Sequence, residues 1–165
     1  MGFDNNCSIA VKGLDFFFGE NQVLHNLDVT IENGRFYVIT GPNGSGKTTL
    51  LKNISKSLQP DKNVVFINGL DVTCIKSREI AKKIACVHQY TNTSFDFPLM
   101  DFVLMGRSPH LGRFEQEGGE DLDIAREAMK ATNTWHLKNR SINEISGGER
   151  QRVIIARALA QKADI

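Results

Sequence analysis

The sequence predicts an α/β fold formed by a single domain. Short runs rich in Val, Ile, Phe and Thr fill much of the first forty positions, a glycine-rich loop joins the last of them to a helical pattern, and helical patterns dominate the second half. With 165 residues, the chain is long enough for one domain with a hydrophobic core and too short for two ordinary domains.

The first half of the chain is expected to alternate between strands and helices. Turn-forming residues at 19–21 and 32–34 separate the early apolar runs, and Pro60 precedes a later run. Ser77 can act as the N-cap of a short helix. The expected strands are residues 8–12, 15–18, 23–31, 36–40, 64–68 and 84–88, and the expected helices are residues 47–56 and 77–83.

The second half is interpreted as a helical insert followed by a return to the strand-helix pattern. Helical patterns at residues 99–106 and 121–132 are joined by a polar stretch that contains three glycines. The insert is expected to extend over about residues 90–148. A final helix is expected at about residues 149–161.

Composition and charge exclude several classes of protein. The formal net charge is +1, so there is no global electrostatic attraction to nucleic acid or to an acidic membrane surface. The three cysteines share no metal-ligand spacing, and no signal peptide is recognisable, which favours a reducing cytosolic compartment. No apolar run approaches the ~18 residues that a membrane-spanning helix needs.

Residues 41–48, Gly-Pro-Asn-Gly-Ser-Gly-Lys-Thr, match the phosphate-binding loop at every fixed position. Glycines let successive backbone N–H groups point inward at a polyphosphate, and the helix that follows adds its positive N-terminal end. Lys47 would reach the β- and γ-phosphates, and the hydroxyl of Thr48 would ligate Mg²⁺. An ordinary glycine-rich turn with a surface lysine is the alternative, but a strand is expected before the loop and a helix after it.

A second motif lies about a hundred residues later. Ser146, Gly147 and Gly148 precede the final expected helix, so a serine N-cap and two bare glycines stand at a helix N-terminus. The motif therefore offers a second anion site in the same chain. Taken alone, it is equally compatible with an ordinary helix cap.

Taken jointly, the two motifs resemble those of ATP-binding cassette (ABC) transporter ATPases. The family signature is usually Leu-Ser-Gly-Gly-Gln, and here Ile145 and Glu149 replace its first and last residues. The resemblance covers about residues 8–165 and implies a P-loop NTPase (ABC ATPase) core with an antiparallel β subdomain and a helical insert. It also implies a head-to-tail dimer, formed with a second copy or a paired ABC subunit, in which each ATP lies between one phosphate loop and the partner's signature. The ATP-binding residues that it implies are Phe18, Gly41, Pro42, Asn43, Gly44, Ser45, Gly46, Lys47, Thr48, Thr49, Ser146, Gly147, Gly148 and Glu149.

Two of the roles implied by the resemblance depend on position alone. Gln89 follows the strand expected at residues 84–88, as does the family glutamine that contacts Mg²⁺ or the attacking water. Gln89 and Lys47 are therefore the expected catalytic residues, and Thr48 and Gln89 the expected metal-binding residues. Phe18, before Gly19, matches the aromatic residue that stacks on adenine, although it could also be a core residue of a strand.

A third segment resembles one group within the family. Residues 103–110, Val-Leu-Met-Gly-Arg-Ser-Pro-His, are similar to a segment of the ATPases that serve importers of ferric siderophores, haem and cobalamin. This resemblance implies integral membrane permease subunits as partners, no nucleic acid, and a peripheral position on the cytoplasmic face of the cell membrane. His110 is not expected to bind metal, because no second ligand stands at ligand spacing. Two alternatives remain: a soluble ABC ATPase that acts on nucleic acid or ribosomes, and a non-hydrolysing nucleotide-binding fragment.

In the family, the helix after the signature leads into an apolar strand that ends in Asp and Glu, which serve Mg²⁺ and the attacking water. This sequence ends with Ala163-Asp164-Ile165, where that strand should begin, so we expect a partial nucleotide-binding domain that lacks its C-terminal part. Asp164 follows no hydrophobic strand and is not expected to replace those carboxylates. The chain is therefore expected to bind ATP poorly, to hydrolyse it negligibly, and to associate or exchange strands through an exposed strand edge.

Overall fold

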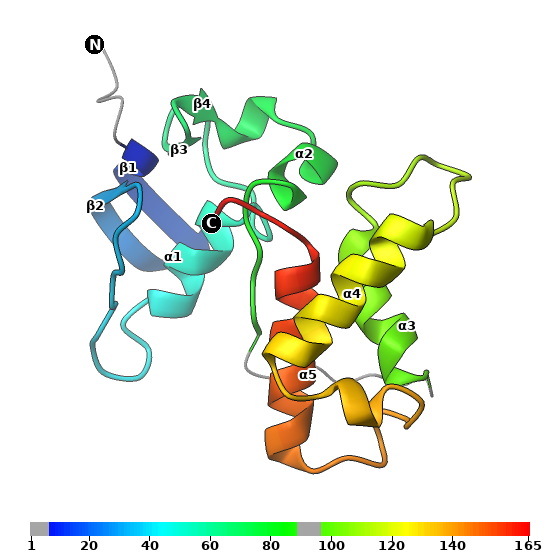
Figure 1. Ribbon diagram of the computed structural model, residues 1–165. Helices are drawn as coiled ribbons and strands as arrows, with labels where there is room; N and C mark the ends of the chain where they lie inside the picture. Colours follow the sequence, from blue (N-terminus) through cyan, green and yellow to red (C-terminus); the bar gives the residue numbers. More distant parts are fainter. Residues whose placement is uncertain (1–6, 89–96) are drawn as a thin grey trace. The chain divides into compact units, whose positions relative to one another are not determined.

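The computed structural model describes residues 7–88 and 97–165 (Figure 1). The chain divides into two compact units, Met1–Ile80 and Ala81–Ile165, which we call the N-terminal unit and the C-terminal unit. The first carries the glycine-rich loop and the second carries the serine-glycine motif, and each is described by itself.

A four-stranded antiparallel sheet forms the frame of the N-terminal unit. Its strands are β1 (Cys7–Phe18), β2 (Asn21–Glu32), β3 (Val65–Ile67) and β4 (Leu70–Asp71), in the order β2-β1-β3-β4. Ile9 of β1 is opposite Ile31 on one side and Ile67 on the other, so β1 lies inside the sheet. The two strands expected at residues 8–12 and 15–18 are therefore one continuous strand.

Helix α1 (Lys47–Ile54) directly follows the glycine-rich loop (Figure 1). Leu50 and Ile54, four residues apart and so on one face of the helix, are both buried. A 3₁₀ turn, η1 (Val72–Cys74), begins where the Asp71 carboxylate accepts the Thr73 N–H at 2.8 Å. Helix α2 (Ser77–Ala81) starts at Ser77 itself, so this serine is the first helical residue and not the expected cap.

The strand expected at residues 36–40 is not formed. Its β-branched and aromatic residues predicted a strand, yet Phe36 is 92% exposed and Val38 is 70% exposed. A strand is completed by hydrogen bonds to a neighbouring strand, and within the described ranges residues 36–40 belong to no sheet. These residues have strand propensity, but no strand among the described residues pairs with them.

The strand expected at residues 84–88 is also absent as a regular element, although its first residues pair with the chain end. The Ile165 N–H donates to the Lys83 carbonyl at 2.9 Å, and the Ala85 N–H donates to the Ile165 carbonyl at 2.8 Å. This exchange is the pattern of a parallel ladder around Ile84. A single paired residue does not make a strand.

In the part of the C-terminal unit that the structure describes, three α-helices form the core: α3 (Leu99–Leu104), α4 (Gly119–Ala131) and α5 (Gly147–Ala160). They correspond to the expected helices, with ends shifted by a few residues, and 3₁₀ turns η2 (Met105–Arg107) and η3 (Trp135–Leu137) lie between them. Figure 1 shows α4 beside α5, and the apolar faces of all three helices enclose a shared core of Leu99, Phe102, Val103, Ala125, Met129, Val153 and Ala156. Among the described residues, no helix is both long enough and apolar enough to cross a membrane.

Candidate functional site

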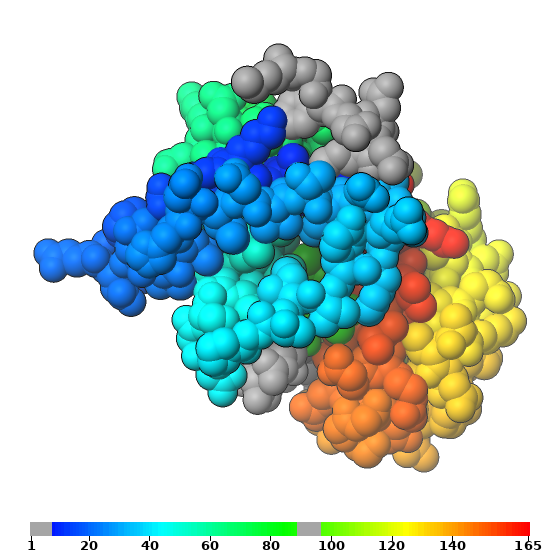
Figure 2. Space-filling model, turned by 90° about the vertical axis from the view of Figure 1, so that its left-hand side faces the viewer, coloured from blue at the N-terminus to red at the C-terminus, as the bar shows by residue number. Residues whose placement is uncertain are grey.

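The glycine-rich loop has a backbone that only glycine adopts easily. Gly41, Gly44 and Gly46 have φ values of 152°, 83° and 86°, all in the region that side chains with a Cβ disfavour. Residues 41–45 are exposed, and Figure 2 shows the segment between β2 and α1, in light blue to cyan, on the face turned to the viewer. The expected loop is therefore formed and accessible.

Gly46 also seats the start of α1 on the sheet. A Cβ at this position would lie 2.6 Å from Leu24 Cδ2 and 3.2 Å from the Val23 carbonyl oxygen, so no larger residue fits without a shift. Gly46 is buried, and the Leu50 N–H donates to its carbonyl at 2.9 Å as the first bond of the helix. Gly46 therefore fixes where α1 begins, because it has a positive φ and lies directly against β2.

Lys47 closes the loop from the inside. Its ammonium donates to the Gly41 carbonyl at 2.8 Å and the Pro42 carbonyl at 2.6 Å, and it lies 3.3 Å from Ser45 Oγ. The chain thus curls around one positive charge. A bound phosphate would take these bonds over, because an anion is a better partner for the ammonium than neutral carbonyls are.

The N-terminus of α1 suits an anion with an associated cation. Gly46 is the N-cap and offers no side chain to the first N–H groups of the helix, which therefore stay available and carry its positive dipole end. Thr48 is exposed, so its hydroxyl can reach Mg²⁺. Thr49 is buried, and its carbonyl accepts the Asn53 side-chain amide at 2.9 Å. Glycines, ammonium and hydroxyl together fit a magnesium–triphosphate group.

Phe18 lies at the end of β1, opposite Asn21. Its side chain is 52% exposed, which excludes the alternative that it is a core residue. The Phe16 ring supports it edge-on, with the ring centroids 5.2 Å apart. The remaining open surface is available to stack on a planar ligand.

The serine-glycine motif forms a complete capping box. Ser146 Oγ accepts the Glu149 N–H at 3.3 Å, and Glu149 Oε2 accepts the Ser146 N–H at 2.8 Å and the Ser146 hydroxyl at 2.7 Å. The bond from the Ser146 hydroxyl, and after it the bond from the Ser146 N–H, lower the pKa of the Glu149 carboxyl. The expected N-cap at Ser146 is confirmed, and α5 begins two residues before the expected Glu149.

Gly147 and Gly148 are not required by packing. Among the described residues, a Cβ on Gly147 would meet no atom within 4 Å, and one on Gly148 would meet only Arg152 Nη1, at 4.0 Å. Glycine in the first turn of a helix lowers its stability, so the bare backbone calls for another reason. Close approach of a ligand to the helix N-terminus is such a reason.

The structure places the expected residues in two groups. The phosphate loop and Phe18 belong to the N-terminal unit, whereas Ser146, Gly147, Gly148 and Glu149 belong to the C-terminal unit. Gln89 lies outside the described residues. The sequence did not reveal that Val23 and Leu24 lie directly against Gly46. A hydrophobic pair in an edge strand does not indicate which glycine packs on it.

Comparison with known proteins places these features in a family. Residues 24–165 match the ABC transporter family. The chain is 39% identical to the hemin import ATP-binding protein of Myxococcus xanthus over 95% of its length, and 38% identical to the ferric enterobactin transport ATP-binding protein of Escherichia coli over 90%. The chain spans 58% and 55% of the lengths of these two relatives.

Solved structures agree with this result. A transporter described as a metal-chelate type ABC transporter, in an inward-facing conformation, superimposes with a TM-score of 0.79 at 29% identity and covers 95% of this chain. The chain covers 57% of that structure. On the match of its residues 24–165, the chain belongs to the ABC transporter family.

Proposed function

We propose that the chain is part of an ATP-binding subunit that couples ATP binding and hydrolysis to the import of an iron chelate, haem or cobalamin across the cell membrane. The observation that carries the proposal is the phosphate loop, closed around Lys47 at the start of α1. The cargo class is supported by relatives that are ATP-binding proteins of hemin, ferric enterobactin and cobalamin import.

The residues of the N-terminal unit would divide the work of binding Mg-ATP. The loop N–H groups and the helix end would hold the phosphates, Lys47 would neutralise the β- and γ-phosphates, and Phe18 would stack on the adenine. Thr48 would ligate Mg²⁺. Mg²⁺ itself would supply positive charge against the phosphates during transfer.

The second helix end supports a paired arrangement. In a head-to-tail dimer, the N-terminus of α5 in one subunit would face the ATP held by the phosphate loop of the other. The exposed Ser146, Gly147 and Gly148 suit this role because no atom of the described residues fills the space beside Gly147. ATP would then close the dimer, and permease subunits would anchor the assembly at the cytoplasmic face of the membrane.

We also propose that this chain alone turns over ATP negligibly. Phosphoryl transfer depends on correctly placed carboxylates around Mg²⁺ and the attacking water. Asp164 is exposed beside Ile165, and we do not assign it a role in holding Mg²⁺ or the attacking water. Phosphate release should therefore remain near the uncatalysed rate at saturating Mg-ATP, and turnover on the order of 1 s⁻¹, within the usual range for enzymes, would contradict the proposal.

The transport role is tested by co-purification. The chain is co-expressed with the integral membrane subunit of a haem, ferric siderophore or cobalamin importer, one at a time, and is separately mixed with ribosomes and with duplex DNA. We expect retention on a membrane subunit and none on ribosomes or DNA. Retention on ribosomes or DNA alone would support a soluble ABC ATPase that acts on nucleic acid and would contradict the import role.

A further inference from the structure

The last turn of α5 is held by side chains from a distant part of the sequence. Arg107 Nη1 donates to the Ala160 carbonyl at 2.9 Å, and His110 Nε2 lies 2.7 Å from the Gln161 carbonyl oxygen. Helix C-termini leave carbonyls without intrahelical partners, and cations are favourable there. These two contacts therefore fix the end of the helix that begins at the signature.

Arg107 is itself rigidly placed. It is 7% exposed, and its Nε donates to Asp121 Oδ1 at 2.8 Å in the first turn of α4. Just before it, Gly106 lies directly against the Arg157 carbonyl, in a space that a Cβ would fill. The end of α5 is thus clamped between α4 and η2.

Gln161, the residue after α5, extends this clamp to residues 81–85. Its side-chain Nε2 donates to the Ile84 carbonyl at 2.8 Å and to the Ala81 carbonyl. The backbone of Ile165 adds the two bonds to Lys83 and Ala85 described above. Every one of these bonds joins residues about eighty positions apart in sequence.

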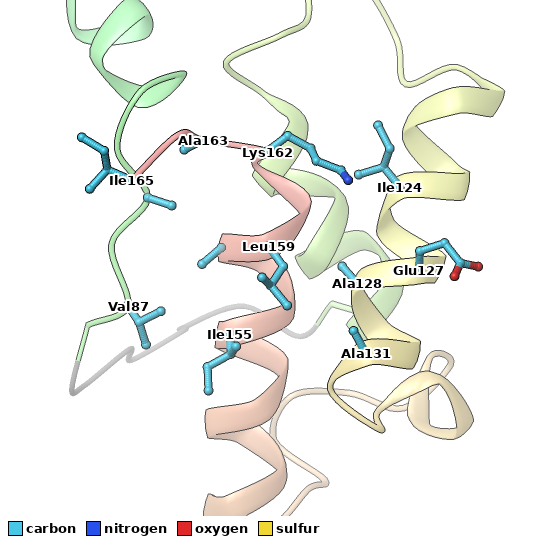
Figure 3. Close-up of a pocket in the computed structure, with 12 residues that line it drawn as sticks. Val87, Ile124, Glu127, Ala128, Ala131, Ile155, Leu159, Lys162, Ala163 and Ile165 are labelled. Carbon is cyan, nitrogen blue, oxygen red and sulfur yellow. The ribbon is translucent and has the colours of Figure 1, made fainter. Parts of the chain in front are cut away.

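Apolar packing alone does not hold this segment. A cavity of about 560 Å³ lies between it and the helices, lined by apolar side chains that include Val87, Ile155, Leu159 and Ile165 (Figure 3). In Figure 3, Ile165 ends the red segment against the green segment that carries Val87. Ile84 is buried, and the hydrogen bonds from the end of α5 add directional contacts to residues 81–85 beside this cavity.

We propose that Gln161 is a positioning residue that locks residues 81–85 to the C-terminal end of the signature helix. His110 holds the Gln161 carbonyl, and Arg107 holds the carbonyl of the preceding Ala160. The helix is about 20 Å long at 1.5 Å per residue, with the signature at one end and this lock at the other. A movement of the signature on ATP would then carry residues 81–85 with it, and Gln89 follows four residues later in the sequence. In this respect the inference rests on the proposed function.

Hydrogen–deuterium exchange of the full 165-residue chain tests the lock without nucleotide. Gln161→Leu removes both donors at similar size, and we expect exchange in residues 82–88 to rise about tenfold, the effect of losing roughly one net hydrogen-bond energy. Exchange in α4 should stay unchanged. Gln151→Leu, the same change at an exposed position of α5, is the matched control and should have no effect.

A third variant separates positioning from simple stability. Gln161→Lys keeps an N–H donor of sufficient reach and should restore slow exchange in residues 82–88. The proposal is overturned if Gln161→Leu leaves these residues unchanged, if α3, α4 and α5 all exchange faster together, or if lysine fails to restore protection. Mg-ATP binding by the same variants is measured separately. A chain that binds no nucleotide contradicts the proposed function, and with it the coupling of residues 81–85 to the signature. The exchange result alone tests whether Gln161 holds residues 81–85.

Discussion

Arg107 Nε lies 2.8 Å from Asp121 Oδ1, and the two side chains are 8% and 14% exposed. The bond from Arg107 and the Gly118 N–H, at 3.0 Å, lower the pKa of the Asp121 carboxyl, and the nearby charge of His110 adds to this. One carboxylate thus caps α4 and holds the arginine that reaches the end of α5. This pair joins three segments of the C-terminal unit.

The Asp121 pair predicts a pH-dependent contribution to stability. Because the folded pKa of Asp121 is lowered, the unfolded chain binds its proton more readily. The contribution is therefore fully present above the unfolded pKa of about 3.9 and is lost as the pH falls through the folded pKa. Asp121→Asn should lower the free energy of unfolding by about 2 kcal/mol at pH 7, with a smaller difference below about pH 4.

Urea unfolding followed by the fluorescence of Trp135, the single tryptophan, checks this prediction. Trp135 belongs to the C-terminal unit and so reports on the unit that contains Asp121. Asp123→Asn is the control, because Asp123 is 66% exposed and pairs with Arg126 at the surface. Equal stability of Asp121→Asn and the unchanged chain at pH 7, or a difference that grows on acidification, would contradict the account.

A side chain at Gly106 should destabilise the C-terminal unit. Since a Cβ there would press on the Arg157 carbonyl of α5, Gly106→Ala is expected to lower the free energy of unfolding by about 1–3 kcal/mol. Gly119→Ala is the matched control: no atom of the described residues lies within 4 Å of its Cβ position at the start of α4, so alanine should be neutral or stabilise by up to about 1 kcal/mol. Thermal unfolding of both variants decides between them, and an equal loss in both would refute the close contact.

Ser146 should matter through its hydroxyl. Ser146→Ala removes the acceptor for the Glu149 N–H and the donor to the Glu149 carboxylate, so it should lower stability by about 1 kcal/mol. Ser146→Thr keeps the hydroxyl and should lose much less. The two variants are compared by the same urea titration, and an alanine variant as stable as the unchanged chain would show that the capping box contributes nothing.

Local sequence rules predicted the elements that form through interactions within a few residues of one another. The phosphate loop, the N-cap at Ser146 and the helices α3, α4 and α5 depend on glycine placement, capping and apolar periodicity within a few residues. The structure contains each of these elements, and the ends of the helices differ from the predicted ends by a few residues.

Features that need a distant partner were not predictable in this way. Residues 36–40 have strand propensity but no described ladder, and among residues 84–88 the described backbone pairing is the one with Ile165. Arg107 and His110 stood out in the sequence only by resemblance, with no physical role assigned. Their contacts with Ala160 and Gln161, more than fifty positions away, supply that role, and no local pattern encodes such a pairing.

Binding of Mg-ATP to this chain, measured by isothermal titration calorimetry, tests the central claim most directly. We predict weak binding that depends on Lys47: Lys47→Ala should weaken it at least about tenfold, which corresponds to about 1.4 kcal/mol. Lys52→Ala, at an exposed position of the same helix, should bind as the unchanged chain does. No binding by the unchanged chain, or equal binding by both lysine variants, would contradict the assignment of residues 41–48 as a nucleotide-binding loop.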